Sequence, residues 1–471
     1  MRVYVQVEDT RDMLKIRSFA RSTMKLQSQS HQQHRNLVKQ FKNMVLFVVL
    51  FLIVSLEVIE SRFHVQTLPG FVGNLPITLE TGYIGVGEAD NEQWFYYFVE
   101  SEGNPEKDPL VLWGAAGPSC STLSILMGTI GPITFNKTIP TSEEAIFEIN
   151  PYRLTKWFVD HPKFLNNPFY LGGVSYNGIL VPMIAHEIYN GNEAGEYPQI
   201  NIKGYFIGNP LTDIHDDYNS RVTFVHRVAL ISDAIYESTK ENCHGEYFNV
   251  DPNNTLCLHD LQVVFKCLER INKENILDPI CDTLDTFKNS HLFRRSLASF
   301  KDNWLLPQAQ AQPCSEDSSL LTAWANRRDV REALHVSEVY DKIKWERCND
   351  SMVFDYRKKS KSYTYNIASS VAYHKHLTYS NCRALIYSGD HDTKVPYLGT
   401  LNWIKSLNLS LVNDWRPWFF DKQVAGYTMK YSARDYNLTF ATVKGGGHQA
   451  DSNKFKECSS MLTRWLSNNA L

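Results

Sequence analysis

Ser175 stands where a sharp turn could present a reactive hydroxyl. The stretch GGVSYNG follows the apolar residues 169–171 and precedes an apolar segment with the pattern of a first helical turn. A serine hydroxyl is a poor nucleophile until a base removes its proton, and small neighbours let a strand-to-helix turn expose it. Asn177 departs from the Gly, Ala or Ser usual in such turns, although Asn tolerates unusual backbone dihedrals. Because a lone G-x-S is common, the partners of Ser175 must be sought elsewhere in the chain.

Two acids and a histidine downstream could activate that hydroxyl. Asp390 and Asp392 end the stretch LIYSGDHD, where they could orient an imidazole or simply accept the backbone amides of a turn. His448 ends the stretch FATVKGGGH, whose three glycines would let it approach another loop closely. Serine, acid and histidine follow one another in the order of the α/β-hydrolases, which predicts a catalytic triad. The backbone N–H groups of Tyr176 and Gly117 are the candidates for stabilising its oxyanion.

The elements that position these residues are short apolar runs, each ending in a small-residue loop. Helical stretches separate four such runs, at residues 110–113, 169–171, 205–207 and 384–387. This alternation predicts a mostly parallel central sheet buried on both faces, with function at the carboxyl ends of its strands. Residues 82–100 predict a hairpin, and residues 324–336 predict an amphipathic helix.

The composition favours one globular domain. The 471 residues are 43% hydrophobic and 21% charged, and a formal net charge of -3 supplies no field for capturing nucleic acid or acidic lipid. Insertions often lengthen α/β enzymes around a single core, so residues 62–471 are predicted to form one α/β-hydrolase domain. Within it, residues from about 214 to 319 hold charged helical stretches and are predicted to be an inserted helical cap.

The N-terminal region has the features of a secretory signal. An apolar run of thirteen residues begins at Met44, which is shorter than the ~20 residues that span a bilayer. Residues 44–61 therefore suit the core and cleavage region of a signal peptide, with cleavage near residues 61–65; a buried helix is the alternative. Because such a core begins close to the start of a protein, the polar residues 1–43 suggest that translation starts at Met24 or Met44, or that they are a gene-model artefact. A secretory location, extracellular or vacuolar, is expected.

Glycosylation acceptors and cysteines point to the same compartment. Five N-x-S/T sequons occur, at Asn136, Asn253, Asn349, Asn408 and Asn437. The nine cysteines could be thiols, metal ligands or disulfides, but none has the close spacing of a zinc or thioredoxin-like motif. We therefore expect disulfides, no metal and no cofactor.

Most of the chain, from about residue 68 to 465, resembles the serine carboxypeptidase-like family of plants. The motifs that carry the resemblance include LPGF, DHPKF, NPFY, IKGYFIGNPLTD, LIYSGDHD and VKGGGH. The opening LPGFVGNLPITLETGYIGVGE is most similar to the branch that contains acyltransferases using glucose esters as acyl donors.

The resemblance implies a role for each candidate residue. Ser175 would be the nucleophile, His448 the base and Asp392, the second acid of GDHD, its orienting partner. Gly117 and Tyr176 match the oxyanion donors. The family's disulfides imply three pairs, Cys120 with Cys348, Cys243 with Cys257, and Cys281 with Cys314. The cysteines left as thiols would be Cys267, Cys382 and Cys458.

Three departures from the family pattern bear on function. Ala115 stands where the family has a side-chain donor in the oxyanion loop, and Val174 stands where it has the Glu or Asp that helps to hold a substrate carboxylate. Only residues 153–156 occupy the place of a strand, a loop and most of a helix, a block of about forty residues. This predicts that a central strand-helix unit beside the strand of Ser175 is missing, through an annotation or splicing error or a decayed gene copy.

The predicted function is acyl handling through an acyl intermediate on Ser175. A carboxypeptidase would pass the acyl group of a peptide to water, and an acyltransferase would pass that of a glucose ester to a hydroxyl. Loss of the polar groups at positions 115 and 174 argues mildly against recognition of a peptide C-terminus. The alternative is a secreted, catalytically impaired pseudoenzyme or truncated product that acts, if at all, as a binding protein. The expected partner is a peptide or a small-molecule ester.

Overall fold

The computed structural model of the protein describes the central sheet, its covering helices and part of the predicted cap. The described residues are 62–86, 92–114, 117, 120–123, 126, 133–135, 147–149, 162–195, 199–280, 317–337, 343–348 and 367–471. Several predicted features lie outside them, namely residues 1–43, residues 44–61, Ala115, Asn136, Cys281, Cys314 and Asn349. The described residues divide into two compact units, one with Arg62–His64 and the described part of Glu80–Tyr96, and the other with Val65–Leu79 and the described part of Tyr97–Leu471.

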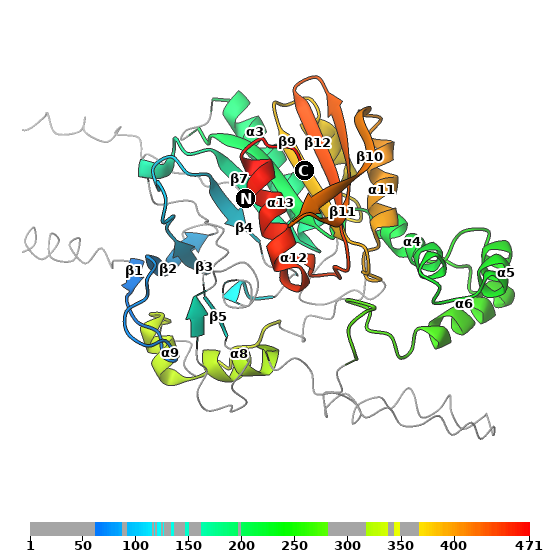
Figure 1. The fold of residues 1–471 in the computed structure, drawn as a ribbon, viewed down its shortest axis with the longest axis horizontal. Helices are drawn as coiled ribbons and strands as arrows, with labels where there is room; N and C mark the ends of the chain where they lie inside the picture. The colour runs from blue at the N-terminus through cyan, green and yellow to red at the C-terminus, as the bar shows by residue number, and fades with distance from the viewer. Residues whose placement is uncertain are drawn as a thin grey trace, which may run out of the picture. The chain divides into compact units, whose positions relative to one another are not determined.

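A seven-stranded sheet forms the centre of the larger unit. Its order is β10-β11-β12-β9-β8-β7-β4 (Figure 1). The bounds in that order are Ser410–Phe420, Gln423–Ala433, Tyr436–Val443, Arg383–Gly389, Ile202–Gly208, Phe169–Val174 and Leu110–Trp113. The strands from β12 to β4 pair in parallel, while β10 and β11 are antiparallel. The predicted mostly parallel sheet of an α/β-hydrolase is therefore confirmed.

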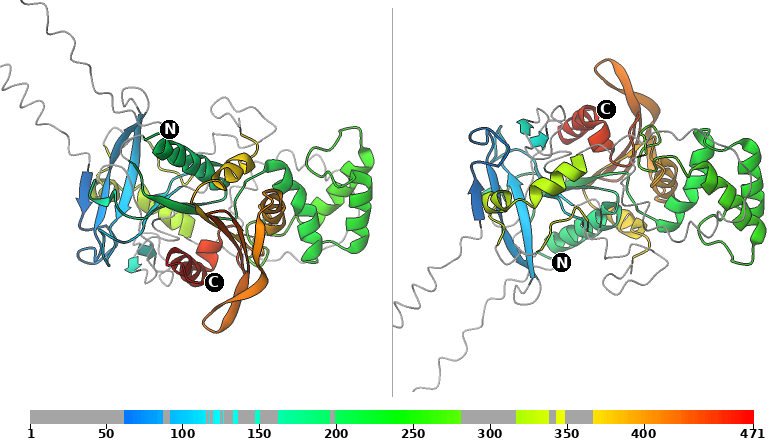
Figure 2. Two further views of the ribbon diagram at one scale, coloured as in Figure 1. Left: turned by 90° about the horizontal axis from the view of Figure 1, so that it is seen from above. Right: turned by 90° about the horizontal axis from the view of Figure 1, so that it is seen from below.

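Helices cover both faces of this sheet, which explains why its inner strands are continuously apolar. One face carries α3 (Asn177–Glu193), α10 (Val371–Leu377) and α11 (Tyr397–Ser406), and the other carries α12 (Ala450–Asn453) and α13 (Phe455–Leu466) (Figure 2). On the second face Met461 and Trp465 of α13 pack against Tyr170 and Phe206 of the sheet. Every residue of β7 is buried, as expected for a parallel strand between two helical layers.

The strand that leads to Ser175 keeps a neighbour on each side. β7 pairs with β8 on one side and with β4 on the other. The sequence analysis placed the missing strand beside β7. This placement is wrong, because both edges of β7 are hydrogen-bonded to neighbouring strands. Among the described strands β4 ends the sheet, and Leu112 on it is 41% exposed. An interior strand of a doubly covered sheet would bury such a side chain, so within the described part of the chain the sheet and its covering layer are incomplete at β4.

Two smaller sheets accompany the central one. The first contains β1 (Arg62–Val65), β2 (Leu79–Val86) and β3 (Glu92–Val99), in that order. Its neighbouring β2 and β3 are the two strands predicted within residues 82–100. The second is an antiparallel pair, β5 (Ile133–Phe135) with β6 (Phe147–Ile149).

The helix predicted over residues 324–336 is two helices. The first, α8, spans Asp317–Ala325, and the second, α9, spans Arg328–Ala333. Asn326 lies between them, where its Oδ1 accepts the N–H of Trp345 at 2.7 Å and its Nδ2 donates to the carbonyl of Trp345 at 2.9 Å. The prediction of one continuous helix was wrong because this side chain bonds a distant backbone segment at the break between the helices.

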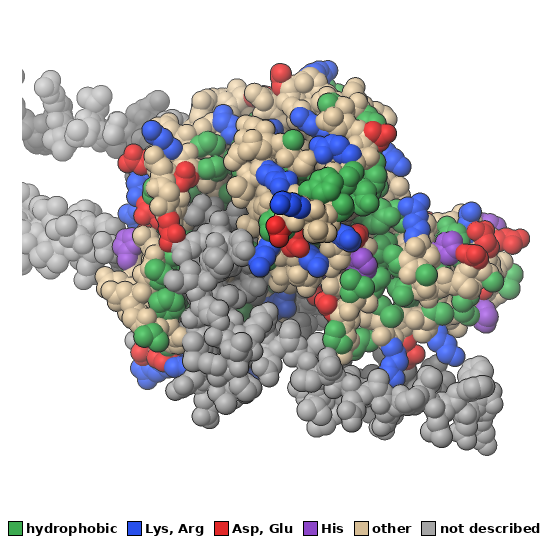
Figure 3. Space-filling view, viewed as in Figure 1, with side chains coloured by type: hydrophobic (Ala, Val, Ile, Leu, Met, Phe, Trp, Pro, Cys, Tyr) green, Lys and Arg blue, Asp and Glu red, His purple; other side chains and the backbone are tan. Residues whose placement is uncertain are grey.

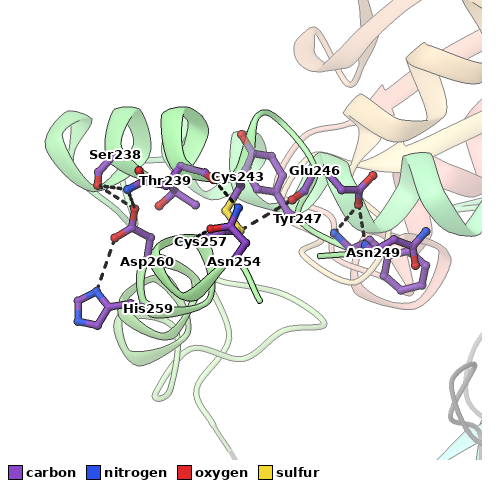
Figure 4. Close-up of a disulfide and its surroundings, with 12 residues drawn as sticks. Ser238, Thr239, Cys243, Glu246, Tyr247, Asn249, Asn254, Cys257, His259 and Asp260 are labelled. Carbon is purple, nitrogen blue, oxygen red and sulfur yellow. Dashed lines mark hydrogen bonds and ion pairs between the residues drawn. A yellow bond between two sulfur atoms is a disulfide. The ribbon is translucent and has the colours of Figure 1, made fainter. Parts of the chain in front are cut away.

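Three helices follow β8 in the region predicted to be a cap. They are α4 (Ile214–Arg227), α5 (Asp233–Cys243) and α6 (Thr255–Cys267), and α4 packs against α11. The disulfide Cys243–Cys257 joins the end of α5 to the start of α6 (Figure 4). Asn254 accepts the N–H of Cys257 at 3.1 Å and so caps α6. The apolar faces of α5 and α6, the N-cap at Asn254 and the disulfide together stabilise this pair of helices. The boundaries of the inserted helical cap, residues 214–319, remain a prediction.

The surface carries both charge signs. On the face shown in Figure 3, basic and acidic side chains of the described residues are interspersed among polar and apolar ones. No described helix combines the length and apolar content needed to cross a membrane.

Candidate active site

Ser175 occupies a left-handed turn between β7 and α3. Its φ is 61°, a conformation that few non-glycine residues adopt and that aims the side chain out of the strand. The loop after β8 holds this turn, because the N–H of Ser175 donates to Gly208 and the N–H of Leu211 donates to the Ser175 carbonyl, at 2.9 and 2.8 Å. A Cβ on Gly178 would lie 2.3 Å from the Leu211 carbonyl oxygen, so only glycine fits there.

Asn177, the unusual residue of the turn, is accommodated by two glycines. Its side chain is buried, and its Nδ2 donates to the Val174 carbonyl at 3.1 Å. A Cβ on Gly114 would lie 2.2 Å from Asn177 Oδ1, and one on Gly173 would lie 2.4 Å from Asn177 Cγ. Asn therefore stabilises the turn from within, which the sequence pattern alone did not show.

The structure brings Ser175, His448 and Asp392 into one hydrogen-bonded line. Nε2 of His448 lies 2.8 Å from Oγ of Ser175, and Nδ1 lies 2.8 Å from Oδ2 of Asp392. His448 is 6% exposed and Asp392 is fully buried. The three residues come from the carboxyl ends of β7, β12 and β9, which lie at the same edge of the parallel sheet. This geometry lets the imidazole accept the hydroxyl proton while the carboxylate holds the ring in place.

The Asp392 carboxylate is saturated with donors. Oδ2 also accepts Asn209 Nδ2 at 2.8 Å and the N–H of Val395 at 3.2 Å, and Oδ1 accepts the N–H of Lys394 at 2.7 Å. Together with His448 these donors hold the carboxylate in one orientation. Sequence reasoning missed Asn209, although the strand-end loop Gly208-Asn209-Pro210 was an available signal. In the structure Asn209 has a φ of 41°, which Asn tolerates.

Asp390, the other acid of the GDHD stretch, binds a different loop. Its Oδ1 lies 2.5 Å from His391 Nδ1 and accepts the N–H of Gly445 at 2.7 Å. Gly445 has a φ of 71° and begins the glycine run before His448. Asp390 therefore fixes the histidine loop rather than the imidazole.

The two candidate oxyanion donors follow adjacent parallel strands. Tyr176 precedes the first residue of α3 at the end of β7, and Gly117 follows β4, the neighbour of β7. The Gly117 carbonyl accepts the N–H of Cys120 at 3.2 Å, and Cys120 forms a disulfide with Cys348. This bond ties the loop of Gly117 to a segment 228 residues away along the chain.

Val174 packs into the apolar core instead of facing a substrate. It is 3% exposed and belongs to the cluster beneath the sheet that contains Trp113 and Val443. At this position, therefore, the chain presents no polar group that could orient a substrate carboxylate.

Asp217 supports the loop that carries Asn209 and Leu211. Its fully buried carboxylate accepts the N–H groups of Thr212 and Asp213 at 2.8 and 3.2 Å. Burial raises the pKa of Asp217 to about 8, although the two backbone donors oppose that rise.

One group of described residues has the ligand types of a metal site, namely Asp213, His215 and Asp216. Each has a structural explanation. Asp213 caps α4 by accepting the N–H of Asp216 at 3.0 Å, and His215 Nε2 lies 2.6 Å from the Glu246 carboxylate. These contacts account for the cluster without an ion.

Comparison with known proteins gives consistent matches. The model of the serine carboxypeptidase family matches residues 69–153 and 137–468. Serine carboxypeptidase-like 17 of Arabidopsis thaliana is 41% identical, over 89% of this chain and 96% of that protein. Serine carboxypeptidase-like 1 of the same plant is 40% identical, over 90% and 97%. Among solved structures, a prohormone-processing carboxypeptidase from Saccharomyces cerevisiae shares the fold, with a TM-score of 0.63 at 18% identity over 87% of this chain and 96% of that one.

The same comparisons bear on the block that the sequence predicts to be missing. The two matched ranges of the family overlap at residues 137–153, and the predicted loss, at residues 153–156, begins at the end of that overlap. The alignment with serine carboxypeptidase-like 17 has 463 positions, while 89% of a 471-residue chain is only about 419 residues. In total, about forty positions of that alignment therefore have no residue of this chain opposite them, a number equal to the size of a strand with its crossover helix.

Proposed function

Because the chain belongs to the serine carboxypeptidase family, we propose that Ser175, His448 and Asp392 act together in acyl transfer through an acyl-serine intermediate. The observation that carries the proposal is the unbroken line from Ser175 Oγ through both nitrogens of His448 to Asp392, with each contact at 2.8 Å. A donor and an acceptor at this distance can exchange a proton without rearrangement.

The reaction proceeds in two halves. His448 Nε2 takes the hydroxyl proton as Ser175 Oγ attacks the acyl carbonyl carbon, and the N–H groups of Tyr176 and Gly117 stabilise the oxyanion. The tetrahedral intermediate collapses, and the leaving group departs with the proton held by His448. A water molecule or an alcohol then attacks the acyl-serine, with His448 again as base, and releases Ser175.

The acyl donor we propose is an ester with a polar leaving group, such as a glucose ester. Val174 is buried among apolar residues and offers no acceptor for the acid group of a peptide C-terminus. Carboxypeptidase activity on peptides is the second candidate, supported by the family to which the chain belongs. The disulfides Cys120–Cys348 and Cys243–Cys257 support a location in the secretory pathway.

A fluorophosphonate probe tests the proposal, because only an activated serine reacts with it. Labelling should fall on the peptide that contains Ser175 and should be absent from Ser175→Ala. Release of product from a C-terminal peptide and from a glucose ester, compared at equal enzyme concentration, then distinguishes the two acyl donors. An unlabelled Ser175 in correctly folded protein would favour the pseudoenzyme alternative.

A further inference from the structure

A short segment after α6, residues 272–278, is hydrogen-bonded to both loops that carry the proposed acid and base. We call this segment the strap. The carbonyl of Lys273 accepts both the N–H and the hydroxyl of Thr393, at 3.2 and 2.8 Å. The carbonyl of Glu274 accepts the N–H of His448 at 2.5 Å. Consecutive carbonyls of the strap therefore bind the loop of the acid and the loop of the base.

The strap and the histidine loop are in close contact at Gly447. A Cβ on Gly447 would lie 2.3 Å from the Glu274 carbonyl oxygen and 2.5 Å from Cβ of Asn275, whose side chain is buried. The next residue, Ile276, donates its N–H to the His391 carbonyl at 3.1 Å, so the strap returns to the loop of the acid. The gap at Gly447 is too narrow for one methyl group, which leaves the histidine loop no room to move toward the strap.

The shape of the strap is stabilised by its own asparagines. Oδ1 of Asn272 accepts the N–H of Glu274 at 2.9 Å, and its Nδ2 donates to the Pro279 carbonyl at 3.1 Å. Oδ1 of Asn275 accepts the N–H of Leu277 at 3.2 Å. Because uncharged amides form these bonds, the strap keeps its shape without relying on ion pairs.

We propose that Thr393 is a positioning residue, whose hydroxyl holds the strap in the place where the strap fixes the backbone of His448. The side chain of Thr393 is 7% exposed, so its hydroxyl bond is largely shielded from water. The imidazole of His448 lies 2.8 Å from Oγ of Ser175, and a displacement of about 1 Å is enough to impair catalysis severely. The inference rests on the proposed function only for its consequence, the rate at which Ser175 reacts.

Hydrogen–deuterium exchange of the His448 amide measures the backbone contact without requiring activity. Thr393→Val removes the hydroxyl but keeps the shape of the side chain and the backbone N–H. The His448 amide should then exchange about two- to tenfold faster, the range that corresponds to one hydrogen bond. Thr393→Ser restores the hydroxyl and should restore the wild-type exchange rate. Mass spectrometry of peptides that contain His448 gives these rates, and an unchanged rate in Thr393→Val would overturn the inference.

The kinetics of fluorophosphonate labelling test the consequence for the reaction. In Thr393→Val the saturating rate of labelling at Ser175 should fall by about threefold or more, while the half-saturating probe concentration stays the same. A displaced base slows the reaction step without changing how the probe binds. Thr393→Ser should label like the wild type, and a half-saturating concentration that changes while the saturating rate does not would contradict a positioning role.

Thr428 on β11 provides a matched control. Its buried hydroxyl donates to the Phe440 carbonyl at 2.8 Å, the same type of bond at the same distance as that of Thr393. Thr428→Val should therefore destabilise the protein to a similar extent but leave labelling and the exchange of the His448 amide unchanged. If the two valine variants speed this exchange equally, the effect is general destabilisation and the inference fails.

A second variant, Gly447→Ala, tests the contact from the histidine loop. The φ of Gly447 lies outside the left-handed region, so alanine suits its backbone and the added methyl group acts by pushing the strap away. Labelling should fall by about 100-fold, and the His448 amide should exchange faster than in Thr393→Val. Wild-type rates in folded Gly447→Ala would contradict the inference. If this variant does not fold, the result with Thr393→Val decides alone.

Failure of the proposed function and failure of this inference give different results. Faster exchange and slower labelling in Thr393→Val support both. If Ser175 of the wild type stays unlabelled while the His448 amide exchanges faster in Thr393→Val, the positioning role is supported and the proposed function is contradicted. If Ser175 of the wild type labels and exchange is unchanged in Thr393→Val, only the positioning role is overturned.

Discussion

Asn209 donates from Nδ2 to Oδ2 of Asp392 at 2.8 Å, and the same oxygen accepts His448 Nδ1. The Oδ1 of Asn209 accepts the N–H of Gly389 at 3.2 Å. One amide side chain therefore fixes the acid of the proposed triad to the end of β9. It does so from a loop 183 residues away, which also bonds Ser175 through Leu211.

Replacing Asn209 by glycine should slow labelling of Ser175 by about 10- to 100-fold, since a buried hydrogen bond to a charged group contributes about 1.5–3 kcal/mol. Glycine keeps the positive φ, so the loss reports the side chain. Asn209→Ala adds backbone strain and should also lower the free energy of unfolding by about 1 kcal/mol relative to Asn209→Gly. An Asn209→Gly variant that labels like wild type would show that the other donors to Asp392 suffice.

Ser175→Ala, Asp392→Asn and His448→Ala should each abolish measurable acyl transfer. Their effects should not add in double variants, because the three residues act as a unit. Asp390→Asn should cost less than about tenfold, since its Oδ1 bonds Gly445 and His391 and an amide oxygen can still accept. Steady-state kinetics on the ester that the wild type turns over fastest measure these losses. Equal losses in Asp390→Asn and Asp392→Asn would contradict the assigned roles.

Removing the Cys120–Cys348 disulfide should destabilise the protein markedly. The bond closes a separation of 228 residues, for which the chain-entropy account gives about 5 kcal/mol. The paired Cys120→Ser and Cys348→Ser variant should unfold at lower denaturant concentration and label more slowly, because the loop of Gly117 loses its tether. Peptide mapping without reductant checks the bond itself and also tests the predicted pair Cys281–Cys314. Free thiols at 120 and 348 in the secreted protein would contradict the assignment.

The stability of the protein should fall between pH 4 and pH 8 in part through Asp217. The pKa of this carboxyl is about 8 in the folded protein against 3.8 ordinarily, so the folded state binds the proton more tightly. Its contribution is complete below about pH 4 and is lost as the pH rises through about 8. Asp217→Asn keeps an acceptor for the N–H of Thr212. The free energy of unfolding of this variant should therefore fall by a few kcal/mol less than that of the wild type as the pH rises. Denaturant unfolding at pH 5 and pH 8 measures it, with the exposed Asp278→Asn as control.

If the free energy of unfolding of Asp217→Asn changes between pH 5 and pH 8 by as much as that of the wild type, the folded protein holds this carboxyl as an ion.

The chain as it stands should label Ser175 weakly. β7 is fully paired, so the weakness is expected to arise at β4, whose end carries the loop of Gly117 and which has one neighbour among the described strands. A triad functions only when its surroundings hold it to within about half an ångström. Reinserting the family's strand-helix block after Lys156 should raise both secretion and the labelling rate, by about tenfold or more. Equal rates in the two chains would show that the block is dispensable.

The strand predictions succeeded where burial on both faces leaves a local signature. The apolar run at residues 110–113 is β4 with the same bounds, and the three other runs lie inside β7, β8 and β9. β10 and β11 were not predicted. Nearly all of β10 is exposed or partly exposed, so it lacks both the continuous and the alternating apolar pattern that marks a strand.

The sequence by itself determined the identity and order of the serine, the acids and the histidine, because each follows a short apolar run and the parallel sheet brings those ends to one edge. The local pattern could not choose between Asp390 and Asp392, because either carboxylate could accept the backbone amides of the same turn. In the tertiary structure Asp392 is the acid that contacts His448, and the same structure supplied Asn209, whose contact with Asp392 joins segments 183 residues apart. Among the described strands it is β4, and not β7, that has an open edge. Pairing partners and side-chain contacts between distant segments depend on packing in three dimensions, which no local pattern of residues encodes.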